Sequence, residues 1–467
     1  MTLAAAFAAG DLDFVPADQL AAWLLEQRWF ATKASSVSEV LIRRSIALDG
    51  ERPFVLAIVE VRFPAGTHNL YQVPLGLRAT GAGAEDVICT VDGFELYDAL
   101  TDTTCTRWLG GLLSGAARVE SDDATLEFHW IDGACAPLAT ATDVRVSPGE
   151  QSNTSLIYDD RVALKVFRRL QAGINPELEM LRFLSERDFA HMPQLLGWYD
   201  HRGELLETTL GVGSSFVADA RDGWQLTLEA LAAGRGAEWA RTLAALGSAT
   251  GLMHTTLGSD PSDPDFAPEP CSPETMALLI AAIDSTVEDT FLDLPDSPAL
   301  APIAGRAEEI QSYVRQAGQV GGGRLVRHHG DYHLGQAMLA GERWVIVDFE
   351  GEPARTLSER RLKRPPLRDV AGMLRSFSYA VAAAERQHAI EVPDDWEGLA
   401  RASFLDAYRA SVDGSLVPAD PAQFERMLAL FELEKSIYEL RYELDHRPDW
   451  VPIPVLAIER LLAGIAS

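Results

Sequence analysis

In the N-terminal part of the chain, apolar and polar residues alternate in short runs that are typical of β-strands. Residues 53–63 and 69–77 alternate in this way on either side of the turn PAGTH, and a helical stretch, residues 17–30, precedes them. Residues 92–113 follow a helical pattern, and residues 124–131 are typical of another strand. This part is therefore expected to be rich in β-structure.

A second β-rich section begins near residue 142. Strands are predicted at about 153–158 and 161–168, on either side of a turn formed by two aspartates. An acidic helix over residues 175–187 follows, and further strands are expected over 194–210. The spacing of these runs predicts a small antiparallel sheet with one helix beside it.

From about residue 223 the pattern changes to a helical one. Apolar residues recur at i, i+3 and i+4 over 239–257, and the tail over 424–450 is also helical. Between them, residues 323–349 form a strand–loop–strand insert. Strands followed by helices indicate an α+β protein with segregated lobes, not a doubly wound sheet.

Composition excludes several classes of partner. The 467 residues exceed one ordinary domain, and the formal net charge is −29. Such a charge argues against nucleic acid and against anionic membrane surfaces, because both need clustered Lys and Arg. Any anionic substrate would then need a local basic site.

The same reasoning bears on location. No stretch reaches the length of a membrane span, and the first residues lack the basic segment of a signal peptide. The four cysteines show no CxxC spacing, which favours reduced thiols over a disulfide framework or a zinc site. A cytoplasmic protein is expected.

Residues 326–353, VRHHGDYHLGQAMLAGERWVIVDFEGEP, carry the densest candidate chemistry. Asp331 lies in a loop, five residues before Gln336 and seventeen before Asp348, and the last two lie near the ends of short strands. Phosphoryl transfer needs a carboxylate for the attacking hydroxyl and oxygen ligands for Mg²⁺. Asp331 suits the first role, and Gln336 and Asp348 the second. The structural alternative is a solvated turn with capping aspartates and packed histidines.

A nucleotide-holding pair is expected upstream. Lys165 lies on a predicted strand, and Glu179 lies on the following helix; a strand lysine held by a helix glutamate is the kinase arrangement. Lysine is also rare here, since Lys33, Lys165, Lys363 and Lys435 are the only four. The preceding loop has one glycine, so its phosphate donors would instead be Ser152, Asn153 and Thr154. Alternatively, these are a strand-edge lysine, a solvated acid and an ordinary turn.

With these residues together, the chain resembles the maltokinases, a group of bacterial sugar kinases with an aminoglycoside-phosphotransferase-like, protein-kinase-like fold. The resemblance extends from about residue 150 to the C-terminus. It rests on EQSNTSLIYDDRVALKVFRRLQAGINPELE, HGDYHLGQ, DFEGEP, PLRDVAGMLRSFSYA and FELEKSIYELRYELDHRPDWVPIP, and QRWF near the N-terminus also matches. HGDxHxGQ and the aspartate loop alone would indicate only the broad superfamily, whereas DFEGEP followed by PLRDVAGMLRSF, with the EKxxYExxYE helix, is far more specific.

The resemblance implies a bilobal kinase-like fold, with a β-rich N-lobe and a mostly helical C-lobe, behind an extra N-terminal β-rich cap domain. The expected division is a cap over 1–92, an intermediate segment over 93–141, a nucleotide-binding lobe over 142–216 and a catalytic, sugar-binding lobe over 217–467. It implies ATP and Mg²⁺ as cofactors, maltose as acceptor at its anomeric hydroxyl, and trehalose synthase as a partner.

For the acceptor, tyrosines and charged residues repeat at four-residue spacing along the tail helix. Sugar hydroxyls need directional partners and an aromatic face, so the sugar site is expected to contain Glu350, Glu352, Arg375, Lys435, Tyr438 and Glu439. Ion pairing on an exposed helix is the structural alternative. Two departures from the family pattern, RWFATKAS without its usual glycine and Ser378 in place of an acid, bear on the acceptor.

Two other functions remain open at this point. One is a kinase of the same fold for another hydroxyl, such as that of glucosamine or an aminoglycoside. The other is a non-catalytic subunit that binds nucleotide, against which the retention of Asp331, Gln336, Asp348 and Lys165 speaks.

Overall fold

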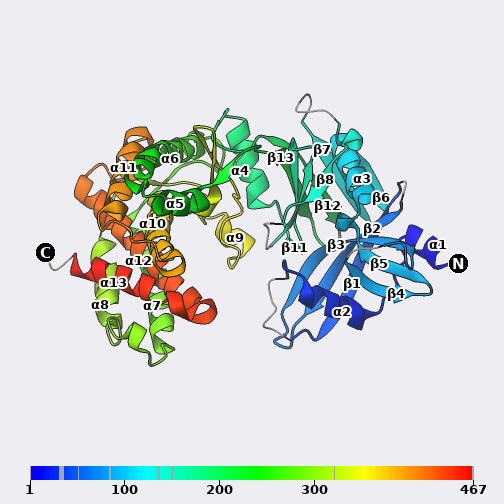
Figure 1. Cartoon of the computed structure of the whole chain (residues 1–467), viewed down its shortest axis with the longest axis horizontal. Helices are drawn as coiled ribbons and strands as arrows, with labels where there is room; N and C mark the ends of the chain where they lie inside the picture. Colours follow the sequence, from blue (N-terminus) through cyan, green and yellow to red (C-terminus); the bar gives the residue numbers. More distant parts are fainter. Residues whose placement is uncertain are drawn as a thin grey trace. The chain divides into compact units, whose positions relative to one another are not determined.

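The computed structural model divides into two compact units, Met1–Ser185 with Pro193–Ala218, and Glu186–Met192 with Asp219–Ser467. It describes residues 2–30, 36–50, 52–83, 86–121, 123–131, 133, 137–148, 152–319 and 321–464. Figure 1 shows the first unit built on sheets and the second built mainly on helices. The α+β kinase-like class predicted above is confirmed.

The first unit contains two antiparallel sheets. The N-terminal sheet has the order β1 (Glu39–Leu48), β2 (Phe54–Arg62), β3 (His68–Ala79), β5 (Phe94–Asp98), β4 (Val87–Val91), and short β11 (Arg169–Leu170) also pairs with β3. The second sheet has the order β6 (Arg118–Ser121), β7 (Ala124–Trp130), β12 (Leu195–Gly203), β13 (Thr208–Ser215), β10 (Val162–Val166), β9 (Thr154–Tyr158), β8 (Val144–Val146).

Strand β2 is buried on both faces, and its side chains point alternately into two separate hydrophobic cores. Phe54, Leu56 and Ile58 pack with residues of the second sheet, whereas the intervening Val55 and Val59 pack with the N-terminal helices. The helices of this unit are α1 (Leu3–Ala8), α2 (Ala17–Glu26), α3 (Thr103–Ser114) and α4 (Pro176–Ser185).

One predicted helix is partly wrong. Residues 92–113 begin with strand β5, which pairs with β3 and β4, and only Thr103–Ser114 form α3. Leu96 and Tyr97 of this strand are buried, and the strand pairing outweighs the helical propensity of Glu and Leu. The limits predicted for the cap and the intermediate segment remain predictions.

The hairpin that carries Lys165 has the predicted form. Strands β9 and β10 pair antiparallel across Asp159 and Asp160, whose φ angles are +48° and +52°. Two-residue turns with positive φ at both positions match the twist of the adjoining strands, and aspartate adopts this conformation more readily than most residues. The turn therefore sets the register that places Lys165 opposite Ser155 of β9, and on its other side Lys165 lies opposite Val212 of β13.

The second unit is a helical domain with two small sheets. One has the order β14 (Arg221–Asp222), β17 (Ala337–Ala340), β18 (Arg343–Ile346), and the other pairs β15 (Glu269–Pro270) with β16 (Arg324–Leu325). The helices are α5 (Gly223–Ala232), α6 (Gly236–Leu257), α7 (Pro273–Leu292), α8 (Ala307–Ala317), α9 (Leu357–Arg360), α10 (Leu367–His388), α11 (Trp396–Ser411), α12 (Pro421–His446) and α13 (Pro452–Ala463).

Helix α10 is the centre of this unit. It packs against α12, α11 and α5, and most of its first turns are buried. The predicted strands at 323–349 are present but shorter, because β16 ends at Leu325 and β18 ends at Ile346. Two polar loops follow these strands: residues 326–333 after β16, which form the Asp331 loop, and residues 347–352 after β18.

Candidate active site

The loop that carries Asp331 is fastened to α10 by Asp369. The Asp369 carboxylate accepts hydrogen bonds from the backbone N–H groups of His329, at 2.7 Å, and Gly330, at 2.9 Å. Its Oδ2 is also 3.1 Å from His254 Nε2. Burial opposes the charge of Asp369, but the imidazoles of His328 and His254 hold the pKa of this carboxyl well below its ordinary value.

The two polar loops meet at a pair of glycines. Gly330 and Gly351 have φ angles of +85° and +74°, and a Cβ on Gly330 would lie 3.3 Å from Gly351 Cα. Glycine satisfies both demands at once, since it adopts positive φ readily and leaves room for the other backbone. The Asp331 loop and the 347–352 loop are therefore neighbours, as the sequence predicted.

His329 connects the same two loops through its ring. Its Nε2 lies 2.9 Å from the carbonyl oxygen of Val347, and its Nδ1 accepts the backbone N–H of Asp331 at 3.4 Å. These partners correspond to the neutral tautomer protonated on Nε2. His333 caps the short turn that leads to Gln336, and burial lowers its pKa. Both histidines shape the loop.

Gln336 and Asp348 come together as predicted. Gln336 Nε2 lies 2.8 Å from Asp348 Oδ2, and Asp348 has a φ angle of +65°. A left-handed conformation at a non-glycine residue costs energy, and aspartate adopts it more readily than most residues. A half-turn of the Gln336 amide would present its oxygen beside the carboxylate, and this oxygen donor set fits Mg²⁺.

Asp331 faces a cavity within the second unit. Lys435 Nζ lies 3.5 Å from Asp331 Oδ1, and it lies 4.8 Å from the ring centroid of Tyr438. The lining consists of Thr286, Gly330, Asp331, Tyr332, Glu352, Arg355, Arg368, Asp369, Gly372, Phe431, Glu434, Lys435 and Tyr438. Glu352, Lys435 and Tyr438 are thus near Asp331, as expected for the acceptor side.

Three other residues expected in the sugar site lie elsewhere. Of the described residues, Arg375, Glu439 and Glu350 are not part of the cavity lining. Arg375 forms a buried ion pair with Glu439, and Glu350 lies beside Arg360, which donates to the Glu350 carbonyl at 3.1 Å. A direct contact of these three with the sugar remains a prediction.

Arginines in the cavity wall were missing from the predicted set of site residues. Arg368 donates to both oxygens of Glu434 at 3.0 Å, and Arg355 donates to Glu352 at 2.6 Å. Arg355 lies three residues after Glu352, so the local spacing could have indicated that pair. No local signal joins Arg368 to Glu434, because they belong to different helices.

On the first unit, the predicted nucleotide lysine is paired with a helix glutamate. Lys165 Nζ lies 2.9 Å from Glu177 Oε2, with both side chains mostly buried. Glu179, the predicted partner, lies two residues further along α4 and is also buried. The helix begins at Pro176, and its second residue, Glu177, faces the strand. Glu179 as the lysine's partner remains a prediction.

The predicted phosphate loop is described only from Ser152 onward, and residues 149–151 lie outside the described residues. Ser152 is exposed, and its Oγ accepts a hydrogen bond from Asn153 Nδ2 at 3.2 Å. Thr154 is buried, and its hydroxyl accepts a hydrogen bond from Arg168 Nε at 2.8 Å. Phosphate contacts of these three residues remain predictions.

Comparison with known families agrees with this arrangement. Residues 23–102 match the maltokinase N-terminal cap domain, and residues 143–405 match the phosphotransferase enzyme family. The chain belongs to the phosphotransferase enzyme family. The resemblance seen in the sequence is thereby confirmed, and the chain is a phosphotransferase that acts on a hydroxyl acceptor in a family that uses ATP.

Relatives of this phosphotransferase include two glucosamine kinases. That of Mycolicibacterium smegmatis is 29% identical over 332 residues, covering 69% of this chain and 80% of the relative. That of Streptacidiphilus jiangxiensis is 26% identical over 362 residues, covering 74% and 79%. A solved glucosamine kinase with glucosamine, ADP and inorganic phosphate has a TM-score of 0.68 at 22% identity and covers 96% of this chain and all of its own. The last likeness shows a shared fold.

The helices of this phosphotransferase offer no membrane span. Across the described ranges, each is too short or too polar to cross a bilayer.

Proposed function

We propose that this phosphotransferase is a sugar kinase that transfers the γ-phosphoryl group of ATP to maltose at its anomeric hydroxyl. The observation that carries the proposal is the position of Asp331 in the wall of a cavity whose other polar groups suit sugar hydroxyls. Asp331 accepts the proton of the attacking hydroxyl and orients it toward the phosphoryl group. Most of the rate then comes from positioning, since phosphoryl transfer needs little acid–base chemistry.

The donor side follows from the residues of each unit. Gln336 and Asp348 would hold Mg²⁺, which neutralises charge on the phosphates when bound. Lys165, oriented by its ion pair with Glu177, binds the α- and β-phosphates of the nucleotide. Ser152 and Asn153 add hydrogen-bond donors from the preceding loop.

The charge state of the cavity favours a neutral acceptor. Its four carboxylates are those of Asp331, Glu352, Asp369 and Glu434. Asp331 is paired with Lys435, Glu352 with Arg355 and Glu434 with Arg368. Asp369 accepts hydrogen bonds from backbone N–H groups. An ammonium group gains most from a carboxylate without a cationic partner. Neutral hydroxyls, by contrast, need no unpaired counter-charge, and their hydrogen bonds to ionised groups are strong.

Glucosamine is the second candidate acceptor, because the two relatives named above are glucosamine kinases. The two acceptors differ in charge, in size and in the hydroxyl available for transfer. A maltose kinase forms a product without a reducing end, whereas transfer to a 6-hydroxyl leaves the reducing end intact.

The test is ADP formation by the purified full-length chain with MgATP and a panel of maltose, glucose, glucosamine and an aminoglycoside. The expected result is turnover with maltose, loss of its reducing ends, and a phosphorus NMR signal of an anomeric phosphate. Turnover with glucosamine alone would replace maltose by the second candidate. Phosphate on a 6-hydroxyl of maltose would overturn the proposed position of transfer.

A cytoplasmic location and trehalose synthase as partner complete the proposal, both on the strength of the resemblance to maltokinases. Co-purification of the tagged chain from its own cells tests them together. Recovery of trehalose synthase with the soluble fraction is expected, and its absence from the purified material would contradict the partnership.

A further inference from the structure

The lysine beside Asp331 is surrounded on its own helix by acidic residues. Glu432, Glu434 and Glu439 all lie within four residues of Lys435 on α12. Lysine and glutamate three or four residues apart on a helix can form an ion pair. The carboxylate found within ion-pair distance of Lys435 is nevertheless that of Asp331, at 3.5 Å, on a different loop.

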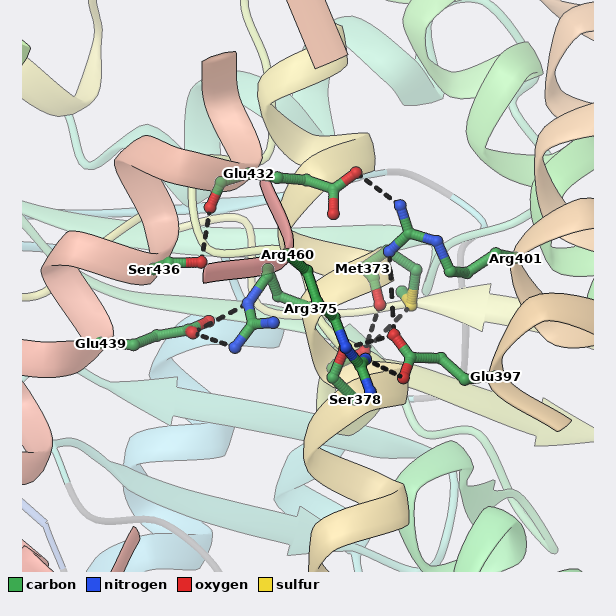
Figure 2. A network of polar contacts seen from close by, with 10 residues as sticks. Met373, Arg375, Ser378, Glu397, Arg401, Glu432, Ser436, Glu439 and Arg460 are labelled. Atoms are coloured by element: carbon green, nitrogen blue, oxygen red, sulfur yellow. Dashed lines mark hydrogen bonds and ion pairs between the residues drawn. The ribbon is translucent and has the colours of Figure 1, made fainter. Parts of the chain in front are cut away.

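Each of these three glutamates is held by an arginine from another helix. Arg401 of α11 donates to Glu432 at 2.6 Å, and Arg368 of α10 binds both oxygens of Glu434 at 3.0 Å. Arg375 of α10 donates twice to Glu439, at 2.9 and 2.7 Å. Figure 2 shows the pairs at Glu432 and Glu439 reaching α12 from separate helices.

The pair of Arg375 and Glu439 is the most secluded of the three. Their side chains are 4% and 10% exposed, so water competes little for either charge. Both hydrogen bonds from Arg375 go to the same oxygen, Oε2, of Glu439. Burial raises the pKa of the Glu439 carboxyl, while Arg375 and Lys435 both act to lower it. The charge of Lys435 is therefore felt by Glu439 in the folded protein.

We propose that Arg375 is a positioning residue that keeps Lys435 available to Asp331. By neutralising Glu439, Arg375 prevents that glutamate from drawing the Lys435 ammonium along the helix and away from the Asp331 carboxylate. Lys435 in turn holds Asp331 toward the acceptor hydroxyl. The inference rests on the proposed function, because it takes Asp331 as the carboxylate that serves the transfer.

This assignment gives Arg375 and Glu439 a role that does not require contact with the sugar. Removal of Arg375 alone leaves a buried carboxylate one turn from Lys435, and Lys435 is then the cation of its own helix that can pair with it. Removal of both partners leaves no carboxylate to attract Lys435. The double substitution is also gentler on folding, since replacing both members of a buried ion pair is often nearly neutral.

The experiment compares Arg375→Met with Arg375→Met/Glu439→Gln in the full-length chain, with kcat and the KM for ATP and sugar measured separately. We expect kcat of Arg375→Met to fall about tenfold or more, and kcat of the double variant to return to within about threefold of wild type. The KM for ATP should be unchanged in both. Lys435→Met should lose at least as much kcat as Arg375→Met, and Lys435→Arg should recover part of it.

A neighbouring ion pair provides the matched control. Arg447 binds both oxygens of Glu443, which is 1% exposed and lies two turns beyond Lys435. Arg447→Met therefore removes the arginine from a buried carboxylate that keeps its hydrogen bond from Tyr379 and is too distant to attract Lys435, and its kcat should stay near wild type.

Two outcomes would overturn the inference. One is a double variant no more active than Arg375→Met, although its melting temperature is at least as high. The other is an equal loss of kcat in Arg447→Met. Absence of phosphoryl transfer by the wild-type chain to any sugar would instead contradict the proposed function, so the two failures are distinguishable.

Discussion

The Asp369 carboxylate, on the first turn of α10, accepts the backbone N–H of Gly330 at 2.9 Å, directly before Asp331. Asp369 also accepts the backbone N–H of His329. These two hydrogen bonds fix the backbone of the loop that carries the proposed catalytic carboxylate. Asp369 touches the loop backbone and His254. Its carboxylate also lines the cavity, but because these bonds hold the backbone next to Asp331, we expect Asp369 to influence phosphoryl transfer through the position of Asp331.

Asp369→Asn is expected to lower both stability and kcat. The amide keeps the size of the side chain but loses its charge, and weakening a buried charged hydrogen-bond set costs about 3 kcal/mol. Thermal unfolding should show a lower melting temperature, and kcat should fall at least tenfold. Asp406→Asn, an exposed position on α11, is the control and should change neither quantity. Full activity of Asp369→Asn would show that the loop holds its position without this carboxylate.

Low pH should remove the contribution of Asp369 to the stability of the folded protein. The pKa of Asp369 is lowered in the folded protein, so its contribution to stability is present above the pKa of an unfolded aspartate, about 3.9, and is lost as pH falls toward the lower folded value. The difference in melting temperature between wild type and Asp369→Asn should therefore be constant from pH 7 to pH 5 and shrink below pH 4. A difference that grows as the pH falls would contradict the assigned charge.

The residues that could be predicted from sequence are those whose partners are close in the chain. Asp331, Gln336 and Asp348 belong to one strand–loop–strand segment, so pairing of β17 with β18 suffices to bring Gln336 to Asp348. Lys165 was identifiable because a two-residue turn fixes the register of its strand. In these segments, local geometry leaves little freedom to the side chains.

The arginine pairs of α10 and α12 had no such local signal. Arg375 and Glu439 are separated by 64 residues, and Arg368 and Glu434 by 66. Which acid each arginine meets depends on how the two helices are rotated and shifted against one another, and side-chain spacing within one helix does not determine that. Tertiary packing thus decided which charged residues of α12 line the cavity, as Glu434 and Lys435 do, and which lie buried beside it, as Glu439 does.

Asp331→Asn is expected to abolish phosphoryl transfer while leaving nucleotide binding nearly intact. The amide cannot accept the proton of the acceptor hydroxyl, and it loses the charge that pairs with Lys435. Turnover should fall by about 10³-fold or more, whereas the Kd for ATP from calorimetry should change less than threefold. An exposed position on α7, Asp289→Asn, is the control. Near-normal turnover would remove Asp331 from the mechanism.

The choice between two glutamates on α4 gives the last prediction. Glu177 is within 2.9 Å of Lys165, and Glu179 is the residue that spacing alone indicated. If the ion pair with Glu177 orients the lysine toward the nucleotide, Glu177→Gln should raise the KM for ATP about tenfold, equivalent to about 1.4 kcal/mol of binding energy. Lys165→Met should have at least as large an effect, and neither should alter the KM for the sugar.

Glu179→Gln decides the assignment when it is measured beside Glu177→Gln, with the exposed Glu204→Gln as control. A larger rise in the KM for ATP at Glu177 would place the lysine's partner at the second residue of α4. A larger rise at Glu179 would restore the partner predicted from sequence, and would mean that Lys165 exchanges Glu177 for Glu179 when nucleotide binds. Equal effects would indicate that the lysine is held by both carboxylates of the first turn of α4.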